Sequence, residues 1–425
     1  MSKTRRPLPR LVYADEQGQI YDHPFLRMLC RKGREILPPR PDECIPLPPG
    51  SDLFLLPNRQ AAGLDPDTGS VVQTDALAVA AFVCPGYTLS GLAAYCSSES
   101  ACPLPLFAYG AVGYAHGQFY LCAQKVDEDQ RQVFSHISPR RIQRGAQSLL
   151  QTYASNRLVR HLANCALSYG CPAAKNLALG RFEAPLPTAR SCNAACIGCI
   201  SRQDPESGFP ATQNRITFRP RVQEITDIMH HHAGQEKRPI FSFGQGCEGE
   251  PLTESGLIRE AVSSFRSQGG PGTVNINTNA SLPEGIPGLA RSGLDSIRVT
   301  MNSARKDLYL AYHRPKSYAF EDVLTCMETA KRHGVFVSLN FLFFPGISDS
   351  EMEYQALADL IAQTGIDFIQ WRNLNLDPEL YLKILPHADS PAMGLKNLLR
   401  RLHKDFPGLR FGYFNPYLPP GLNGH

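Results

Sequence analysis

Strand and helix patterns alternate between residues 188 and 374, and this alternation constrains the fold more than any other feature of the sequence. Apolar runs typical of strands are each followed by a segment with helical periodicity. Strands are expected at 188–191, 240–246, 273–280, 296–303, 335–343 and 368–374. Helices are expected at 222–232, 254–267, 283–292, 320–333 and 350–364. Strands that alternate with helices pair in parallel through helical crossovers, so the sequence predicts an α/β fold.

The later strands of this segment carry polar side chains at alternate positions. The polar sets are Asn275, Asn277 and Asn279; Arg298, Thr300 and Asn302; Ser338 and Asn340; and Gln370 and Arg372. Side chains alternate between the two faces of a strand, so each set points to one face. Parallel strands covered on both faces are usually apolar throughout, and burying unpaired polar groups costs free energy. A polar, ligand-lined cavity inside an open barrel explains the pattern better than a flavodoxin-like sheet with an exposed face.

Sequence patterns divide the chain into five parts. Residues 1–50 are rich in proline and basic side chains and are expected to form an extended leader with a short helix at 24–32. Short apolar segments separated by turn residues predict a β-rich domain over 51–138. A helical connector is expected over 139–185, the α/β core over 186–380, and a C-terminal helix and tail over 381–425.

Composition narrows the class of protein. A chain of 425 residues with 43% hydrophobic residues can build more than one core. The formal net charge of +4 and the lack of a long basic run argue against a nucleic-acid partner. Neither a long apolar segment nor a signal-peptide core is recognisable, so we expect no membrane partner and a cytoplasmic location. Thirteen cysteines in such a chain are expected to stay reduced or to bind metal.

Cys192, Cys196 and Cys199 follow the first expected strand within eight residues. Thiolates at this spacing can converge on one soft metal centre. Three thiolates on a cluster of four irons leave the fourth iron open to bind another molecule. A zinc site would need a fourth Cys or His close by, and this segment has none.

The cysteine pattern resembles the signature of the radical S-adenosylmethionine (radical SAM) superfamily. This resemblance implies a partial (β/α)6 barrel with a [4Fe–4S] cluster held by Cys192, Cys196 and Cys199 and with SAM on the fourth iron. It implies oxidoreductase chemistry in which SAM is cleaved reductively and a 5′-deoxyadenosyl radical abstracts hydrogen from a substrate. One departure from the family pattern is Gly198, because the residue before the last cysteine is commonly aromatic. The contact to adenine would then come from Ile197 or from the backbone.

A second motif follows the second expected strand. Gly249, Glu250 and Pro251 resemble the family's Gly-Gly-Glu-Pro motif, with Glu248 in place of the first glycine. Glycine at a strand end lets backbone approach a ligand closely, and an anionic Glu250 suits the ammonium group of SAM. On its own the motif also fits a turn before a helix.

Two further strand ends complete the cofactor-binding residues that the resemblance implies. Thr278 and Asn279 resemble the family's Thr-Asn-Gly turn, and Arg298 to Asn302 resembles its fourth-strand motif. By this resemblance Thr278 and Thr300 would contact the amino-acid end of SAM, and Asn302 would contact the ribose. Each could instead cap a strand end.

Cys247 is the candidate catalytic residue, as a hydrogen-atom donor, a ligand of a second cluster or a contact to substrate; it could equally be an inert buried thiol. A second iron–sulfur cluster could be assembled from the N-terminal cysteines Cys84, Cys96, Cys102, Cys165 and Cys171. The alternative is that these thiols are small buried hydrophobes. Arg298 and Arg372 could bind a substrate carboxylate or phosphate, or form a buried structural salt bridge.

The leading hypothesis is a radical SAM enzyme with a small-molecule or peptide substrate and an electron donor such as flavodoxin or ferredoxin. Three alternatives stay open. The first is an iron–sulfur electron carrier or sensor without SAM turnover, the second an RNA-modifying radical SAM enzyme, and the third a zinc-binding structural protein.

Overall fold

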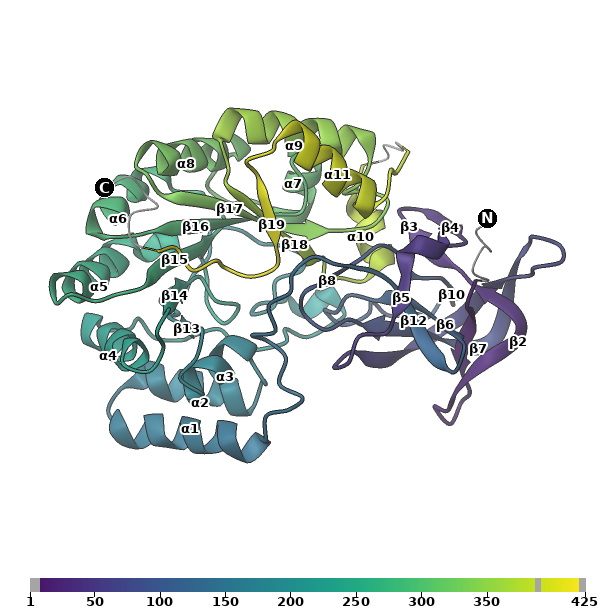
Figure 1. Ribbon diagram of the computed structural model, residues 1–425, viewed down its shortest axis with the longest axis horizontal. Coiled ribbons are helices and arrows are strands. Elements are labelled where there is room, and N and C mark those ends of the chain that lie inside the picture. The colour runs from purple at the N-terminus through teal and green to yellow at the C-terminus, as the bar shows by residue number, and fades with distance from the viewer. Residues whose placement is uncertain (1–7, 387–390, 420–425) are drawn as a thin grey trace, which may run out of the picture.

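The computed structural model describes residues 8–386 and 391–419. An α/β core and an antiparallel β-domain lie side by side (Figure 1). This arrangement confirms the predicted fold class, a parallel sheet with helices preceded by a β-rich N-terminal region. In the described part of the chain, no helix combines the length and the apolar content needed to cross a membrane.

The core sheet is parallel throughout, and its strands are paired in the order in which they occur in the chain. Its strands are β13 (Glu183–Pro185), β14 (Ile240–Phe243), β15 (Thr273–Thr278), β16 (Ser296–Met301), β17 (Phe336–Phe343), β18 (Phe368–Asn373) and β19 (Arg410–Gly412). Its helices are α4 (Val222–Ala233), α5 (Ser255–Ser267), α6 (Ile286–Ser292), α7 (Lys306–His313), α8 (Phe320–Arg332), α9 (Glu351–Thr364), α10 (Pro378–Ile384) and α11 (Leu395–Asp405). Right-handed crossovers between strands in sequential order put the helices on one face, as in a barrel wall.

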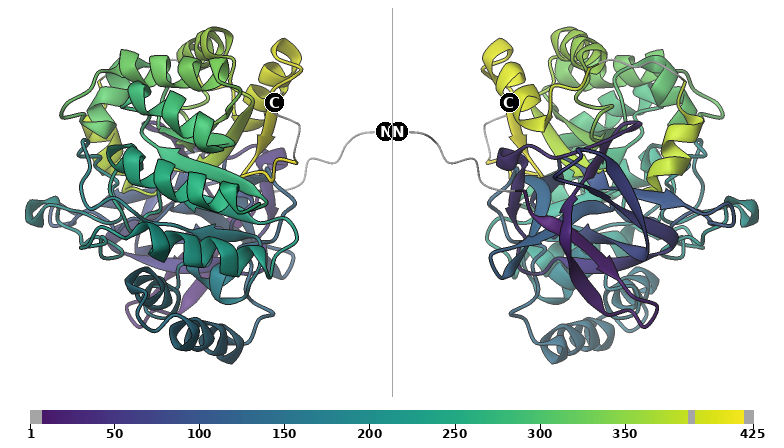
Figure 2. Two further views of the ribbon diagram at one scale, coloured as in Figure 1. Left: turned by 90° about the vertical axis from the view of Figure 1, so that its left-hand side faces the viewer. Right: turned by 90° about the vertical axis from the view of Figure 1, so that its right-hand side faces the viewer.

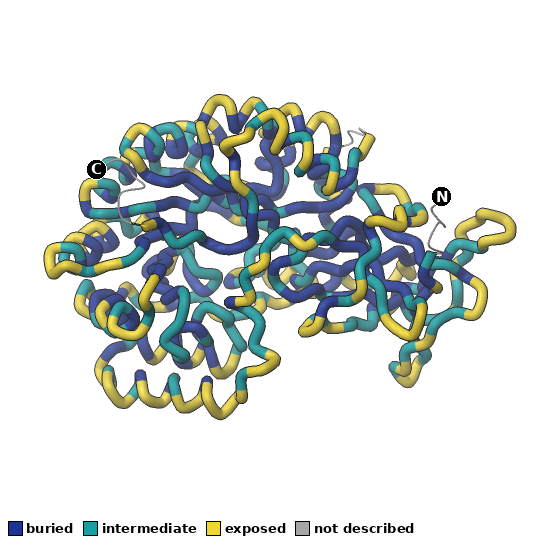
Figure 3. The backbone as a smooth tube through the Cα atoms, in the orientation of Figure 1, coloured by how far each residue is buried: buried dark blue, intermediate teal, exposed yellow. Residues whose placement is uncertain are grey.

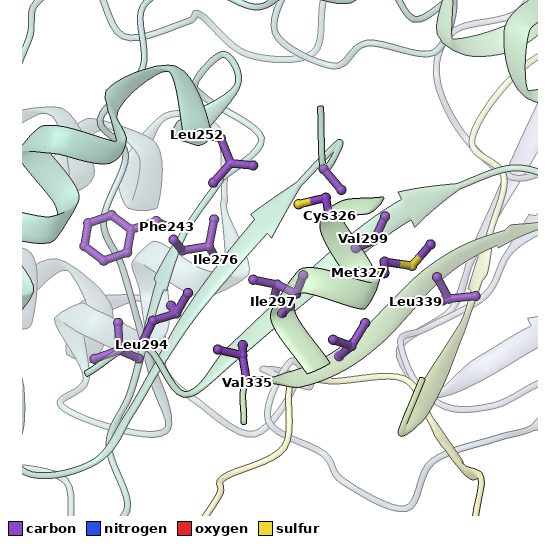
Figure 4. Packing of buried hydrophobic residues seen from close by; sticks show 14 of the residues in the cluster. Phe243, Leu252, Ile276, Leu294, Ile297, Val299, Cys326, Met327, Val335 and Leu339 are labelled. Carbon is purple, nitrogen blue, oxygen red and sulfur yellow. The ribbon is translucent and has the colours of Figure 1, made fainter. Parts of the chain in front are cut away.

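The two faces of this sheet differ as the strand patterns predict. Helices cover the outer face (Figure 2), and apolar side chains such as Ile276, Ile297, Val299 and Leu339 pack against them (Figure 4). Polar side chains align in rows on the inner face, where Asn277 pairs with Arg298 and Thr300 with Asn340 in the strand register. The alternation of side chains along each strand therefore places apolar residues on the face covered by helices and polar residues on the inner face.

At the amino ends of the strands, the polar side chains of the inner face are hydrogen-bonded to one another. Asn415, from the segment after β19, donates to Glu183 at 2.9 Å and accepts from Gln370 at 2.9 Å. Asn275 donates to Asn277 at 2.8 Å and accepts from Ser296 at 2.8 Å. These polar groups are satisfied by one another, so the expected ligand-lined cavity does not extend to this end of the sheet.

The first strand differs from the prediction. The expected strand at 188–191 is not part of the sheet, and β13 at Glu183–Pro185 takes its place. The backbone amides of Thr188 and Ala189 are instead bound by the Glu248 carboxylate. Residues 188–191 therefore lead from the sheet into the cysteine segment.

The β-domain is antiparallel and includes residues that were expected to form a leader. Its strands are β1 (Arg10–Ala14), β2 (Ile20–Met28), β3 (Cys30–Lys32), β4 (Glu35–Leu37), β5 (Cys44–Pro46), β6 (Asp52–Leu64), β7 (Val71–Phe82), β8 (Tyr87–Leu89), β9 (Leu92–Ala93), β10 (Tyr95–Ser97), β11 (Gly110–Ala115) and β12 (Gln118–Lys125). The helix expected at 24–32 is wrong, because 20–28 is strand β2, which pairs with β1 and β6.

The β-domain packs on the core at the carboxyl ends of β17 and β18. Thr88 donates to the carbonyl of Trp371 at 2.7 Å, and Asn373 donates to the carbonyl of Tyr87 at 3.0 Å. One apolar cluster contains side chains from both parts, including Leu89 and Leu121 from the β-domain and Phe344 and Tyr381 from the core. The joint is buried, as the tube coloured by burial shows (Figure 3).

Helices α1 (Pro139–Thr152), α2 (Arg157–Leu167) and α3 (Pro172–Ala178) connect the two parts. Leu149, Leu158 and Leu177 belong to the same apolar cluster as the core sheet. Helix α2 also lies against α4 through an ion pair between Arg157 and Glu224. These helices therefore extend the helical layer of the core beyond β13.

Candidate active site

The cysteine segment is held in place by the end of helix α7. Ala195 donates to the carbonyl of His313 at 3.2 Å, and Ile197 donates to the carbonyl of Tyr312 at 3.1 Å. Lys316 donates to the carbonyl of Asn193 at 2.9 Å. Backbone hydrogen bonds on both sides thus fix a segment that has no regular secondary structure.

The three thiols of this segment lie near enough to one another to interact electrostatically. Burial raises the pKa of Cys196, and the neighbouring thiols of Cys192 and Cys199 raise it further. The Nδ1 atom of His313 is 3.4 Å from the Cys196 sulfur, and an Arg215 nitrogen is 3.5 Å from the Cys199 sulfur. The sequence predicted the thiols but not Arg215 and His313, because both reach the segment only through the fold.

The segment that contains Glu250 lies beside the residues that precede Cys192. Gly249 donates to the carbonyl of Ala189 at 2.7 Å, and Glu250 donates to the carbonyl of Ser191 at 2.9 Å. A Cβ atom at position 249 would overlap the Ser191 carbonyl oxygen, so this position requires glycine. Glu248, the departure from the family motif, accepts hydrogen bonds from Thr188, Ala189 and Gln245 and ties the two segments together.

The carboxylate of Glu250 is buried and has no cationic partner among the described residues. It accepts hydrogen bonds from the Thr278 hydroxyl, from the Asn279 amide at 2.8 Å and from the Leu252 amide at 3.0 Å. Burial raises its pKa to about 7. A buried carboxylate that is oriented but not charge-paired is suited to bind a cationic group of a ligand.

The remaining strand-end residues have different surroundings. Asn279 donates to Asn193 at 2.8 Å, which links the end of β15 to the cysteine segment. Thr300 accepts from Asn340 at 3.1 Å on the inner face of the sheet. Asn302 is fully buried and donates to the Leu308 carbonyl and the Tyr381 hydroxyl, while its Oδ1 atom has no hydrogen-bond partner. The structure therefore brings the cysteines, Glu250, Thr278 and Asn279 together, and places Asn302 against α7 and α10.

Residues 186–356 match the family model described as the Radical SAM superfamily. This segment is a radical SAM domain. The chain is also 28% identical over 181 residues to the GTP 3′,8-cyclase of Heliobacterium modesticaldum, a match that covers 42% of this chain and 51% of the cyclase. The match thus spans about half the length of that relative.

Two solved structures overlap this chain in part. One is a radical SAM methyltransferase from Sphaerobacter thermophilus, with 14% identity, a TM-score of 0.38, and coverage of 55% of this chain and 65% of the other. The second is the FeFe-hydrogenase maturase HydG from Carboxydothermus hydrogenoformans, with 14% identity, a TM-score of 0.39, and coverage of 64% of this chain and 68% of the other.

Radical SAM domains use a [4Fe–4S] cluster and SAM, and the residues of this domain fit both. Thiolates are the ligands that iron–sulfur clusters require, and three thiols are gathered beside the motif that contains Glu250. The unpaired Glu250 carboxylate fits the ammonium group of SAM.

Gly198 departs from the usual radical SAM pattern for a structural reason. A Cβ atom at this position would overlap the hydroxyl of Tyr312, which is buried at the end of α7. The ring of Tyr312 thus fills space that a side chain at 198 would need. The aromatic residue beside the last cysteine comes from α7 and not from the cysteine segment itself.

Arg298 and Arg372 place two positive charges on the inner face of the radical SAM domain. Arg298 donates to Gln370 at 3.1 Å, and Arg372 donates to the Tyr413 carbonyl at 3.1 Å. Burial and the nearby Arg372 lower the pKa of Arg298 to about 10. Neither guanidinium forms an ion pair within the described residues, and Nε of Arg298 is buried without a hydrogen-bond partner. The alternative of a buried structural salt bridge is therefore not observed in this part of the chain.

The cysteines considered for a second cluster separate into two regions. Cys84, Cys96 and Cys102 belong to the β-domain, where Cys102 is exposed. Cys165 and Cys171 lie in the helical connector and pack with Cys247 in one small cluster. Only the second group adjoins the radical SAM motif through Cys247.

Proposed function

We propose that this protein is a radical SAM enzyme in which Cys192, Cys196 and Cys199 hold the cluster. When bound, the cluster and SAM supply a 5′-deoxyadenosyl radical, which abstracts hydrogen from the substrate. The observation that carries the proposal is that the segment of the three thiols is hydrogen-bonded to the segment of Glu250, a buried carboxylate that lacks a cation.

In this proposal the residues of the site position SAM and shield it from water. Thr278 and Asn279 fix the Glu250 carboxylate, which would receive the ammonium group of SAM. Thr300 lies on the inner face of the next strand and would contact the same end of SAM. Asn302, whose buried Oδ1 atom has no hydrogen-bond partner, would contact the ribose, as the family resemblance implies. The β-domain covers the carboxyl ends of β17 and β18 and would exclude water from this side of the site.

We propose a small-molecule or peptide substrate with an anionic group. The unpaired guanidiniums of Arg298 and Arg372 support this choice, because carboxylate and phosphate are the groups that arginine binds best. An electron donor such as flavodoxin or ferredoxin would supply the electron. We place the protein in the cytoplasm, where its thirteen free thiols would stay reduced.

Cleavage of SAM tests the proposal directly. Protein reconstituted with iron and sulfide under anaerobic conditions, then given dithionite and SAM, should form 5′-deoxyadenosine. The Cys196→Ala variant should form none, and Cys326→Ala, which changes a buried thiol on helix α8, should retain the activity. A protein that holds four irons and reduces reversibly but never cleaves SAM would be an electron carrier or sensor instead.

Glu250→Gln tests the assignment of the SAM-binding carboxylate. The amide keeps the size of the side chain but removes its charge, so the affinity for SAM should fall about tenfold or more, as expected for loss of one charge-assisted contact. Equilibrium dialysis with labelled SAM measures the affinity, and the iron content should stay unchanged. Equal affinities in both proteins would rule out Glu250 as the ammonium ligand.

A further inference from the structure

His161, Cys165 and Cys247 form a second group of metal-binding side chains, apart from the three cysteines of the radical SAM motif. Their ligand atoms all lie within 4.8 Å of one another. His161 and Cys165 are one turn apart on α2, so both face the same side of the helix. Cys247 comes from the segment after β14, so residues far apart in sequence meet at one point.

The surroundings of this group are those of an enclosed site. Cys165 is 1% exposed and Cys247 is 3% exposed, whereas His161 is half-buried and forms the outer side. The His161 Nε2 atom is 3.6 Å from the Cys165 sulfur, and the Cys247 sulfur lies within 4.8 Å of both atoms. Cys171 packs against the same cluster, and its amide donates to the Cys165 carbonyl at 3.0 Å.

The size of the group favours a single ion over an iron–sulfur cluster. Zinc bonds of about 2.3 Å to sulfur and about 2.0 Å to nitrogen place tetrahedral ligand atoms roughly 3.5–3.8 Å apart. Small side-chain rotations would bring the atoms of His161, Cys165 and Cys247 to that spacing, and rotation of the Cys171 side chain, which packs against the same cluster, would add a fourth ligand. In a four-iron cluster each thiolate binds a different iron, so the ligand atoms stand farther apart.

We infer that His161, Cys165, Cys171 and Cys247 bind one zinc ion. Three thiolates and one imidazole are a donor set that structural zinc sites use. The ion would join helix α2 and the turn before α3 to the segment that contains Gly249 and Glu250. Zinc would thereby fix the connector helices to the segment that we assign to SAM binding. Only this link to SAM binding rests on the proposed function; the zinc site itself does not.

Metal analysis tests the inference without reference to SAM cleavage. Protein purified without chelators should contain about one zinc per chain in addition to iron. Cys165→Ser and His161→Ala should each lose most of the zinc during dialysis against a mild chelator, with the iron content unchanged. Cys326→Ser removes a buried thiol that belongs to no such group and should keep its zinc. The half-buried His161 makes the second variant informative even where Cys165→Ser fails to fold.

Cobalt substitution identifies the ligands. Co²⁺ at the site should show the intense visible bands of a tetrahedral thiolate complex, and Cys171→Ser should lower the sulfur-to-cobalt charge-transfer absorption by about one third, since one of three thiolates is lost. Zinc that persists in Cys165→Ser would overturn the inference. Loss of iron from that variant, or a Cys165–Cys247 disulfide in protein handled without air, would do the same.

Discussion

A side chain at position 198 would compete with the Tyr312 hydroxyl for the same space beside Cys199. Gly198→Ala should lower the free energy of unfolding by about 1–3 kcal/mol, the usual cost of overpacking a buried site. Tyr312→Phe removes the overlapping oxygen, so the double variant should lose less than the sum of the two single variants. Urea denaturation of the four proteins measures the coupling.

A matched control for this prediction is Gly256→Ala. Gly256 lies in α5, and a Cβ atom there would meet nothing within 4 Å. Alanine has the higher helix propensity, so this variant should gain up to about 1 kcal/mol. Additive effects of Gly198→Ala and Tyr312→Phe would show that the two residues do not compete for space.

The residues of the candidate site differ in how far the sequence could predict them. The cysteines, Gly249 and Glu250 are close together in the chain, so their spacing is visible without a structure. Arg215, Tyr312 and His313 reach the cysteine segment only because α7 and the segment before α4 fold against it. Single polar or aromatic residues outside a motif have no periodic signal.

At the scale of elements, Glu224 joins α4 to α2. Its carboxylate accepts from two side-chain nitrogens of Arg157, at 2.8 and 2.7 Å, and from the backbone amides of Arg157 and Arg221. Hydrogen bonds from the Arg157 side chain, together with those from the backbone amides, lower the pKa of Glu224 to about 2, although burial acts in the opposite direction. An acid with a pKa below its unfolded value of 4.5 stabilises the fold above pH 4.5, and this stabilisation is lost as the pH falls towards 2.

Glu224→Gln should therefore lower the free energy of unfolding by about 1–2 kcal/mol at pH 7, a figure reduced for the solvent that screens the partly exposed Arg157. The difference between the two proteins should fall by more than half near pH 3. Urea denaturation at both pH values measures it. The exposed Glu128→Gln should change little at either pH. An effect independent of pH would show that the ion pair contributes nothing and that only the hydrogen bonds matter.

Periodic elements were predictable, and elements made by long-range pairing were not. The predicted helix at 350–364 and the strand at 335–343 agree with α9 and β17 within about one residue, because each has a strong apolar period. Strand β2 contains Pro24 and buries only Leu26 and Met28, so its sequence lacks the apolar alternation of a strand. Only its pairing with β1 and β6 makes it extended.

At the scale of the whole molecule, the joint between the β-domain and the radical SAM core contains a buried ion pair. Arg59 on β6 and Asp377 at the start of α10 are 2.9 Å apart, and each side chain is 2% exposed. Asp377 also accepts from the Leu104 amide at 2.7 Å, so its carboxylate, at the start of α10 in the core, binds two groups of the β-domain. Removing one member of a buried pair leaves the other charge uncompensated.

Arg59→Met should therefore lower the free energy of unfolding by about 3–5 kcal/mol. Asp377→Asn neutralises the carboxylate but keeps an acceptor, so the double variant should be more stable than Arg59→Met alone. Lys306→Met is the control, because the Lys306–Glu321 pair is exposed and should contribute little to stability. Scanning calorimetry measures wild type and all of these variants, and the two parts of wild type should unfold in one transition. A cost for Arg59→Met no larger than for Lys306→Met would mean that apolar packing alone joins the β-domain to the core.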